Sequence, residues 1–211
     1  MQTKIATLLC VAMMTVSLQV MSADTFEAGK DYMVLDSKQP TSTGDKVEVL
    51  EFFSYGCPHC AHLEPVLQEW KQNSAPADVS IVRVPVAWNE GFETFARVYY
   101  AAEMAGASDE AHAAMFKLLH EDKPEQLNLQ IVADTFGSQG VDADKFIQYF
   151  GSKEVTNRVM KAKELARRYK VTGVPTIFVD GSYAVPSPKA GTFPRMIQVV
   201  SSLPAEADGT P

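Results

Sequence analysis

Two cysteines with two residues between them carry the clearest chemical signal in this sequence. Cys57 and Cys60 enclose Pro58 and His59 to give the tetrapeptide CPHC. A thiolate, rather than a thiol, attacks a disulfide, so such a pair can exchange disulfides if one sulfur ionises readily. A bridge across so short a loop restricts the unfolded chain very little, which disfavours a purely structural disulfide. The pair therefore predicts a reactive thiol–disulfide centre.

The predicted local structure assigns different roles to the two sulfurs. Val47–Phe53 is rich in Val and Phe and predicts a strand, and a helix is predicted from Pro58 to about Gln72. The amino end of a helix has free N–H groups and partial positive charge, which stabilise an anion. We therefore expect Cys57 to have a lowered pKa and to attack. Cys60, one turn further on, should be more buried and resolve the intermediate.

His59 gives this chemistry a direction. It lies between the cysteines and can carry positive charge, which favours the Cys57 thiolate. Stabilising the thiolate stabilises the dithiol form, so the disulfide becomes the stronger oxidant. The CPHC sequence therefore favours a protein that gives its disulfide away.

A metal site is the main alternative for the cysteine pair. A structural zinc site needs four ligands, and His62 could supply a third. No second cysteine pair exists, and His112 and His120 are expected to lie far away in the helical middle of the chain. We therefore predict no metal ion and no other bound cofactor.

A glutamate in the predicted strand is a candidate proton carrier. Glu51 alternates with Val49 and Phe53 on one face, so it could be buried beneath the cysteines. A buried carboxylate has a raised pKa and could take a proton from Cys60. The alternative is an exposed glutamate at a sheet edge.

Val174 and Pro175 open a later predicted strand. A proline is hard to place in a regular ladder there. A cis peptide bond would solve the geometry and leave backbone groups free to pair with a client peptide. An ordinary trans proline at the start of the strand is the alternative.

The amino terminus has the layout of a secretory signal peptide. Lys4 is the only charged residue before Asp24, the segment 5–20 is largely apolar, and small residues precede Asp24. A membrane anchor would need ~20 predominantly apolar residues, and this run is shorter. Cleavage after about residue 23 would remove Cys10 and leave Cys57 and Cys60 as the only cysteines. Export would place that pair in an oxidising compartment.

The composition fits a globular protein and disfavours nucleic-acid binding. The 211 residues are 46% hydrophobic and 21% charged, with a formal charge of −7. Removing residues 1–23 would leave 18 basic and 26 acidic residues, a charge of −8. Nucleic-acid binding normally requires clustered Lys and Arg, which this chain lacks.

The order of the predicted elements indicates an α/β core that is interrupted by helices. Pro85 and Val174 lie much further apart than the dozen or so residues that a simple crossover needs. We expect a core at 24–86 and 164–211, with a helical insertion at 87–163. Val79–Pro85 is predicted to be a second core strand, and further strands are predicted at Val174–Val179 and Tyr183–Val185. Helices are predicted at Glu93–Ala105, Asp109–Glu121, Leu127–Phe136, Asp142–Phe150, Ser152–Tyr169 and Phe193–Leu203, and a frayed tail at Pro204–Pro211.

Two segments carry a family resemblance. Residues 52–60 read FFSYGCPHC and residues 171–183 read VTGVPTIFVDGSY. Together they resemble the DsbA family of bacterial periplasmic dithiol oxidases, whereas thioredoxins carry CGPC. The resemblance covers nearly all of the chain after the predicted signal peptide. Pro65, inside the predicted active-site helix, is the one departure from the expected pattern.

The resemblance implies a thioredoxin fold with an inserted all-helical subdomain. It implies that the Cys57–Cys60 disulfide is donated to reduced, newly exported proteins through a mixed disulfide at Cys57. It also implies reoxidation by a DsbB-like membrane partner that passes electrons to quinone. Val174 and Pro175 would contact clients and Glu51 would be the buried acid. Nothing in the sequence demands more than a monomer.

Other functions remain open on the same scaffold. A reductase or isomerase of the thioredoxin superfamily would use the same cysteines, although residues 24–46 are too few to form the dimerisation domain that periplasmic isomerases usually carry. A metal-binding or chaperone module is a non-enzymatic alternative.

Overall fold

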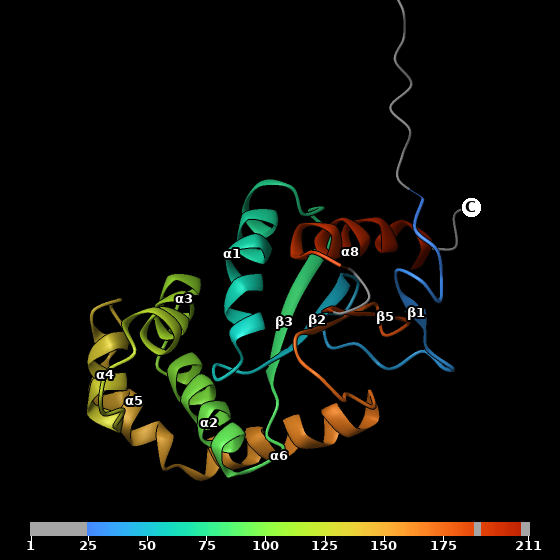
Figure 1. Ribbon diagram of the computed structural model, residues 1–211. Coiled ribbons are helices and arrows are strands. Elements are labelled where there is room, and N and C mark those ends of the chain that lie inside the picture. The colour runs from blue at the N-terminus through green and yellow to red at the C-terminus, as the bar shows by residue number, and fades with distance from the viewer. Residues whose placement is uncertain (1–24, 188–190, 208–211) are drawn as a thin grey trace, which may run out of the picture.

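A mixed β-sheet forms the centre of the computed structural model, which describes residues 25–187 and 191–207. The strand order is β1-β5-β4-β2-β3 (Figure 1). The central strand β2 pairs in parallel with β3 and antiparallel with β4. The predicted signal peptide and Cys10 lie outside the described residues. The strands are β1 Met33–Val34, β2 Val47–Phe53, β3 Val79–Pro85, β4 Thr176–Val179 and β5 Tyr183–Pro186.

Helices cover both faces of this sheet (Figure 1). On one face, α1 and α8 bury Leu67 and Val199 against Ile177 of β4. On the other face, Phe52 and Phe178 join the core that extends through α6 into the remaining helices. The helices are α1 Pro58–Asn73, α2 Glu90–Met104, α3 Asp109–Lys117, the π-helix η1 Leu118–Asp122, α4 Leu129–Gly137, α5 Ala143–Phe150, α6 Lys153–Arg168 and α8 Phe193–Ala207. Within the described ranges, no helix is both long and apolar enough to span a membrane.

Several predicted elements differ from the observed ones. The predicted core strand β3 lies at the edge of the sheet, because among the described residues it pairs only with β2. Helix α2 begins earlier than predicted, because the Asn89 side chain accepts a hydrogen bond from Phe92 N and caps the helix there. Helix α8 runs on to Ala207, where a frayed tail was predicted. The proposed domain boundary at residue 163 falls inside the continuous helix α6.

The turn between β4 and β5 depends on a glycine. Asp180 and Gly181 both have positive φ, at 48° and 64°. A Cβ atom on Gly181 would lie 2.1 Å from the carbonyl oxygen of Gln39. Gln39 N also donates a hydrogen bond to the carbonyl of Gly181. Gly181 therefore provides both the left-handed turn and the space for the segment after β1.

The first prediction compares Gly181→Ala with Gly44→Ala. Gly44 also has a positive φ, of 65°, but a Cβ atom added there would have no neighbour within 4 Å. Gly44→Ala should lower the free energy of unfolding by about 1 kcal/mol through backbone strain alone. Gly181→Ala adds a backbone collision and should cost roughly 1 kcal/mol more. Equal losses in chemical denaturation would contradict the role given to the Gln39 contact.

Candidate active site

The two cysteines lie where strand β2 passes into helix α1. Cys57 is the N-cap residue of α1, with Pro58 in the first turn, and it is half-buried. Its Sγ donates a hydrogen bond to the carbonyl oxygen of Val174 at 3.5 Å, across 117 residues of sequence. The Val174–Pro175 peptide bond is cis. The fold thus places the predicted proline loop directly beside the more accessible sulfur.

The two sulfurs have opposite pKa shifts. A hydrogen bond from the Cys60 thiol lowers the pKa of Cys57 to about 6. The backbone N–H groups of His59 and Cys60 and the charge of His59 act in the same direction, and partial burial opposes them. Burial, together with the neighbouring Cys57 thiolate, strongly raises the pKa of Cys60, which is 0% exposed. Cys57 therefore ionises first, and Cys60 keeps its proton.

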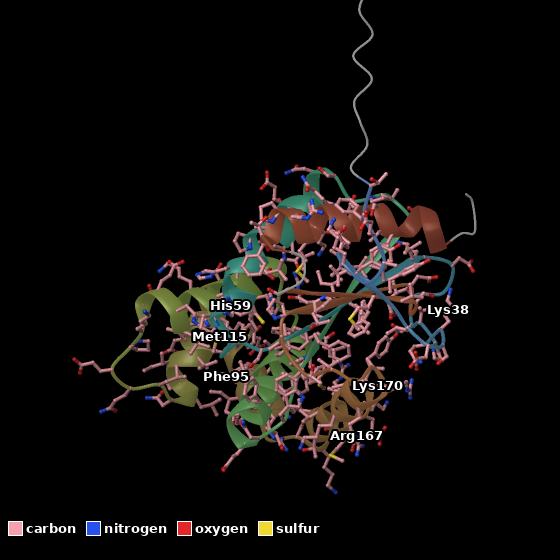
Figure 2. The ribbon with its side chains drawn as sticks, turned by 45° about the vertical axis from the view of Figure 1, so that its right-hand side comes forward. Lys38, His59, Phe95, Met115, Arg167 and Lys170 are labelled. Carbon is pink, nitrogen blue, oxygen red and sulfur yellow. The ribbon has the colours of Figure 1, made fainter. Side chains whose placement is uncertain are left out.

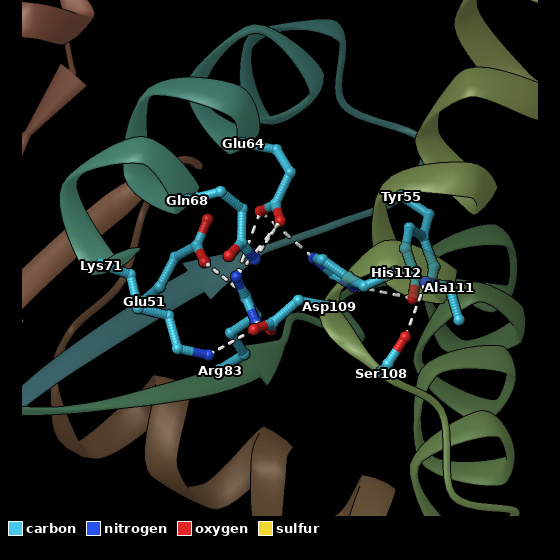
Figure 3. Close-up of polar contacts among 10 residues, drawn as sticks. All are labelled: Glu51, Tyr55, Glu64, Gln68, Lys71, Arg83, Ser108, Asp109, Ala111 and His112. Atoms are coloured by element: carbon cyan, nitrogen blue, oxygen red, sulfur yellow. Dashed lines mark hydrogen bonds and ion pairs between the residues drawn. The ribbon is translucent and has the colours of Figure 1, made fainter. Parts of the chain in front are cut away.

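The side chain of Glu51 is 1% exposed and faces Arg83 (Figure 3). The two residues are directly paired between β2 and β3, and Arg83 Nε lies 3.3 Å from Glu51 Oε2. Burial raises the pKa of Glu51 to about 7, against the lowering effect of Arg83. The negative charge of Glu51 in turn helps to raise the pKa of Cys60. Glu51 can thus exchange a proton near neutral pH.

Arg83 binds two further carboxylates from other elements. Its Nη2 lies 3.2 Å from Glu64 of α1, and its Nη1 lies 2.8 Å from Asp109 of α3. Although burial opposes ionisation, His112 and Arg83 lower the pKa of Glu64. Lys71 and Arg83 likewise lower the pKa of Asp109 despite its partial burial. One guanidinium is therefore divided among three acids, which leaves Glu51 incompletely neutralised.

Two histidines lie nearer to the cysteine pair than the sequence predicted. His112 and His120 were expected far from the cysteines, yet both contact Tyr55, two residues before Cys57.

His59 is exposed, on the same side of the molecule as Phe95 of α2 (Figure 2). Across residues 25–187 and 191–207, no group of three or more His, Cys, Asp or Glu side chains could hold a metal ion.

The buried charge network of Arg83 and Glu64 was not predicted from the sequence. Glu64, on α1 beside the cysteine pair, is 2% exposed. The sequence did contain a clue to the network, because Arg83 lies between Val82 and Val84 in a largely apolar strand. A charge at such a position needs a buried partner. The partner could not be named without the register of β2 against β3.

Sheet, helix and cysteine pair together define a class of protein, the thiol–disulfide oxidoreductases of the thioredoxin fold. The family model of the DSBA-like thioredoxin domain matches residues 48–198. The chain therefore belongs to the DsbA-like family, and it is a thiol–disulfide oxidoreductase.

Named relatives agree with this assignment. The thiol:disulfide interchange protein DsbA of Pseudomonas aeruginosa strain PAO1 is 37% identical over 169 residues, which cover 80% of each chain. The protein of the same name from Pseudomonas syringae pv. tomato is 33% identical over 88% of this chain and 86% of its own length. The crystal structure of Pseudomonas aeruginosa DsbA is 33% identical and superposes with a TM-score of 0.79 over 87% of this chain and 95% of the other. The DsbA oxidoreductase of Xylella fastidiosa gives a TM-score of 0.77 at 32% identity, over 87% and 98% of the two chains.

The second prediction concerns ionisation of Cys57. Iodoacetamide should alkylate the reduced protein with a pH midpoint of about 6, far below the ordinary thiol value of 9.0. Because the folded-state pKa is depressed, ionisation stabilises the folded reduced protein. That contribution is complete above about pH 9 and is lost as the pH falls through about 6. The stability of reduced protein relative to Cys57→Ser should therefore rise across this window. A midpoint near 9 would contradict the stabilisation of the Cys57 thiolate by the Cys60 thiol and the start of α1.

Proposed function

We propose that this protein is a dithiol oxidase that donates its Cys57–Cys60 disulfide to reduced proteins exported into a bacterial periplasm. The observation that carries the proposal is the contrast between the two sulfurs. Cys57 is half-buried and its thiolate is stabilised, whereas Cys60 is fully buried and protonated. Stabilising the Cys57 thiolate favours the reduced form, which makes the oxidised form an effective disulfide donor.

The transfer proceeds through two exchanges. A client thiolate attacks Cys57 Sγ, forms a mixed disulfide and breaks the Cys57–Cys60 bond, so that Cys60 leaves as a thiolate. Glu51, whose pKa is raised to about 7, supplies the proton that Cys60 takes up. A second client thiolate then attacks the client sulfur of the mixed disulfide and releases the Cys57 thiolate. The client dithiol is oxidised by two electrons, and the protein disulfide is reduced by the same two.

Val174 and Pro175 are the proposed client contacts. A client sulfur bound to Cys57 must approach beside this loop, because the Val174 carbonyl lies 3.5 Å from Cys57 Sγ. Pro58 and His59 lie at the exposed amino end of α1 and border the same approach. These four residues and the two cysteines make up the proposed reaction site.

Turnover requires a second partner that removes the two electrons. We assign this role to a DsbB-like membrane oxidase that passes the electrons to quinone. The predicted signal peptide at 1–23 supports a periplasmic location for both encounters. The protein would act as a monomer, with residues 87–163 as a helical insertion between 24–86 and 164–211 of the thioredoxin-like part.

The third prediction tests the direction and the roles of the two cysteines. At equilibrium with glutathione, the wild-type disulfide should be reduced far more readily than that of a thioredoxin. The oxidised protein should also oxidise a reduced unfolded protein. When the Cys57 thiolate of Cys60→Ser attacks a disulfide-bonded client and displaces one client thiolate, the mixed disulfide should accumulate, because no Cys60 thiol is present to attack Cys57 Sγ and release it. Cys57→Ser should neither trap nor oxidise clients. A couple as reducing as that of thioredoxin would favour the reductase alternative and overturn the oxidase proposal.

The fourth prediction tests Glu51 as the proton carrier. Attack by Cys60 on a Cys57–glutathione mixed disulfide requires loss of the Cys60 proton, so its rate should rise as Glu51 ionises near pH 7. Glu51→Gln should slow glutathione release roughly a hundredfold above pH 7, the lower end of the usual contribution of a positioned base, and remove that inflection. The exposed Glu69 offers a matched control, since Glu69→Gln should leave the pH profile unchanged. An unchanged profile in Glu51→Gln would exclude Glu51 from the proton transfer.

A further inference from the structure

The segment just before Cys57 is a tight turn that is held from outside the sheet. Cys57 N donates to the carbonyl of Ser54 at 3.0 Å, and Gly56 N donates to Ser54 Oγ at 3.2 Å. Tyr55, which lies between Ser54 and Gly56 in the sequence, is 1% exposed. The position of this turn determines where the Cys57 sulfur sits relative to α1 and to Val174.

His120 holds the backbone of the turn. Its Nε2 lies 2.7 Å from the carbonyl oxygen of Tyr55. A carbonyl can only accept, so Nε2 carries the hydrogen and donates it. His120 lies in the π-helix η1, which is closed by Lys123 N donating to the carbonyl of Leu118 at 3.0 Å. This single wide turn interrupts the regular helix at the place where His120 contacts Tyr55.

His112 holds the side chain of the same tyrosine. Its Nδ1 lies 2.8 Å from the Tyr55 hydroxyl, and its Nε2 lies 3.4 Å from Glu64 Oε2 (Figure 3). Burial lowers the pKa of His112 against the raising effect of Glu64, which favours the neutral ring. With its hydrogen on Nε2 facing the carboxylate, Nδ1 accepts the hydrogen bond from the Tyr55 hydroxyl. Arg83 also binds Glu64 of α1 and Asp109 of α3, and these ion pairs fix both helices next to the contact of His112 with Tyr55.

A third contact closes the turn at Gly56 and comes from α2, in the helical segment of residues 87–163. A Cβ atom at this position would lie 2.7 Å from Cε2 of Phe95 in α2. The ring of Phe95 therefore packs against the bare backbone of Gly56. Three side chains from α2, α3 and η1 thus contact two consecutive residues directly ahead of Cys57.

From this geometry we infer that His112 and His120 are positioning residues, which clamp Tyr55 and thereby hold Cys57 at the amino end of α1 beside Val174. The inference deepens the proposed function, because it assigns to the helical segment a role in setting the reactivity of the cysteine. The backbone N–H groups stabilise the thiolate only while the sulfur stays within hydrogen-bonding distance of them. Loosening the clamp weakens these contacts without removing any group that touches the sulfur.

The fifth prediction measures the Cys57 thiolate in purified reduced protein by ultraviolet absorbance against pH, alongside thermal unfolding. Tyr55→Phe removes only the hydroxyl that His112 accepts from, and His120→Ala removes the donor to the Tyr55 carbonyl. Each should raise the pKa of Cys57 by on the order of half a pH unit, the usual scale for a charge at a helix end. Alkylation at about pH 6 should slow about twofold, because less thiolate is present. His120→Gln retains a donor at the Nε2 position and should stay close to wild type.

Asn128→Ala separates positioning from general loosening of the helices. The Asn128 side chain caps α4 by accepting from Ile131 N, in the same helical segment but away from Tyr55. Its loss should lower the unfolding temperature and leave the Cys57 titration unchanged. The inference is overturned if Tyr55→Phe and His120→Ala lower stability without moving the titration. It is equally overturned if Asn128→Ala moves the titration as far as they do.

These readouts are independent of the proposed function. The thiolate titration uses neither a client protein nor a reoxidising partner. Failure of wild type to oxidise a reduced client would refute the oxidase proposal and leave the clamp intact. Unchanged titrations in an active enzyme would refute the clamp alone.

Discussion

The Arg83 guanidinium is the point at which the sheet, the active-site helix and the helical segment meet. It contacts one carboxylate from each of β2, α1 and α3, namely Glu51, Glu64 and Asp109. Burying charge is costly unless each group finds a partner, so the positions of these elements are interdependent. A displacement of α3, for example, would leave part of the guanidinium without a carboxylate. The geometry around the cysteines rests on this shared cation.

Dividing one cation among three acids also has a chemical consequence. Glu64 and Asp109 have further positive or hydrogen-bonding neighbours, and their pKa values are lowered. Glu51 has Arg83 as its main compensation, and its pKa rises to about 7. The network therefore keeps one of its acids able to exchange a proton near neutrality. That acid lies on the strand that leads into the cysteine pair.

Local patterns in the sequence predicted much of the fold. The bounds of β2 were obtained from its run of Val and Phe, and α1 was placed within a residue or two by Pro58 and its apolar stripe. Predictions weakened where an element's ends depend on a side-chain cap, as at Asn89, or where a helix changes its hydrogen bonding, as it does at Leu118. These features are set by a few atoms in three dimensions and leave little trace in hydrophobic periodicity.

The sequence by itself determined the class of chemistry: two cysteines at the start of a helix, and hence the prediction that the Cys57 thiol ionises before the Cys60 thiol. Those conclusions depend on short-range effects, namely residue spacing, helix ends and the ionisation of a thiol. Only the tertiary structure decided what surrounds that pair. Tyr55 meets His112 across 57 residues and His120 across 65, and Arg83 meets three acids from separate elements. Such contacts follow from strand register and helix packing, which bring distant residues together and have no local signature in the chain.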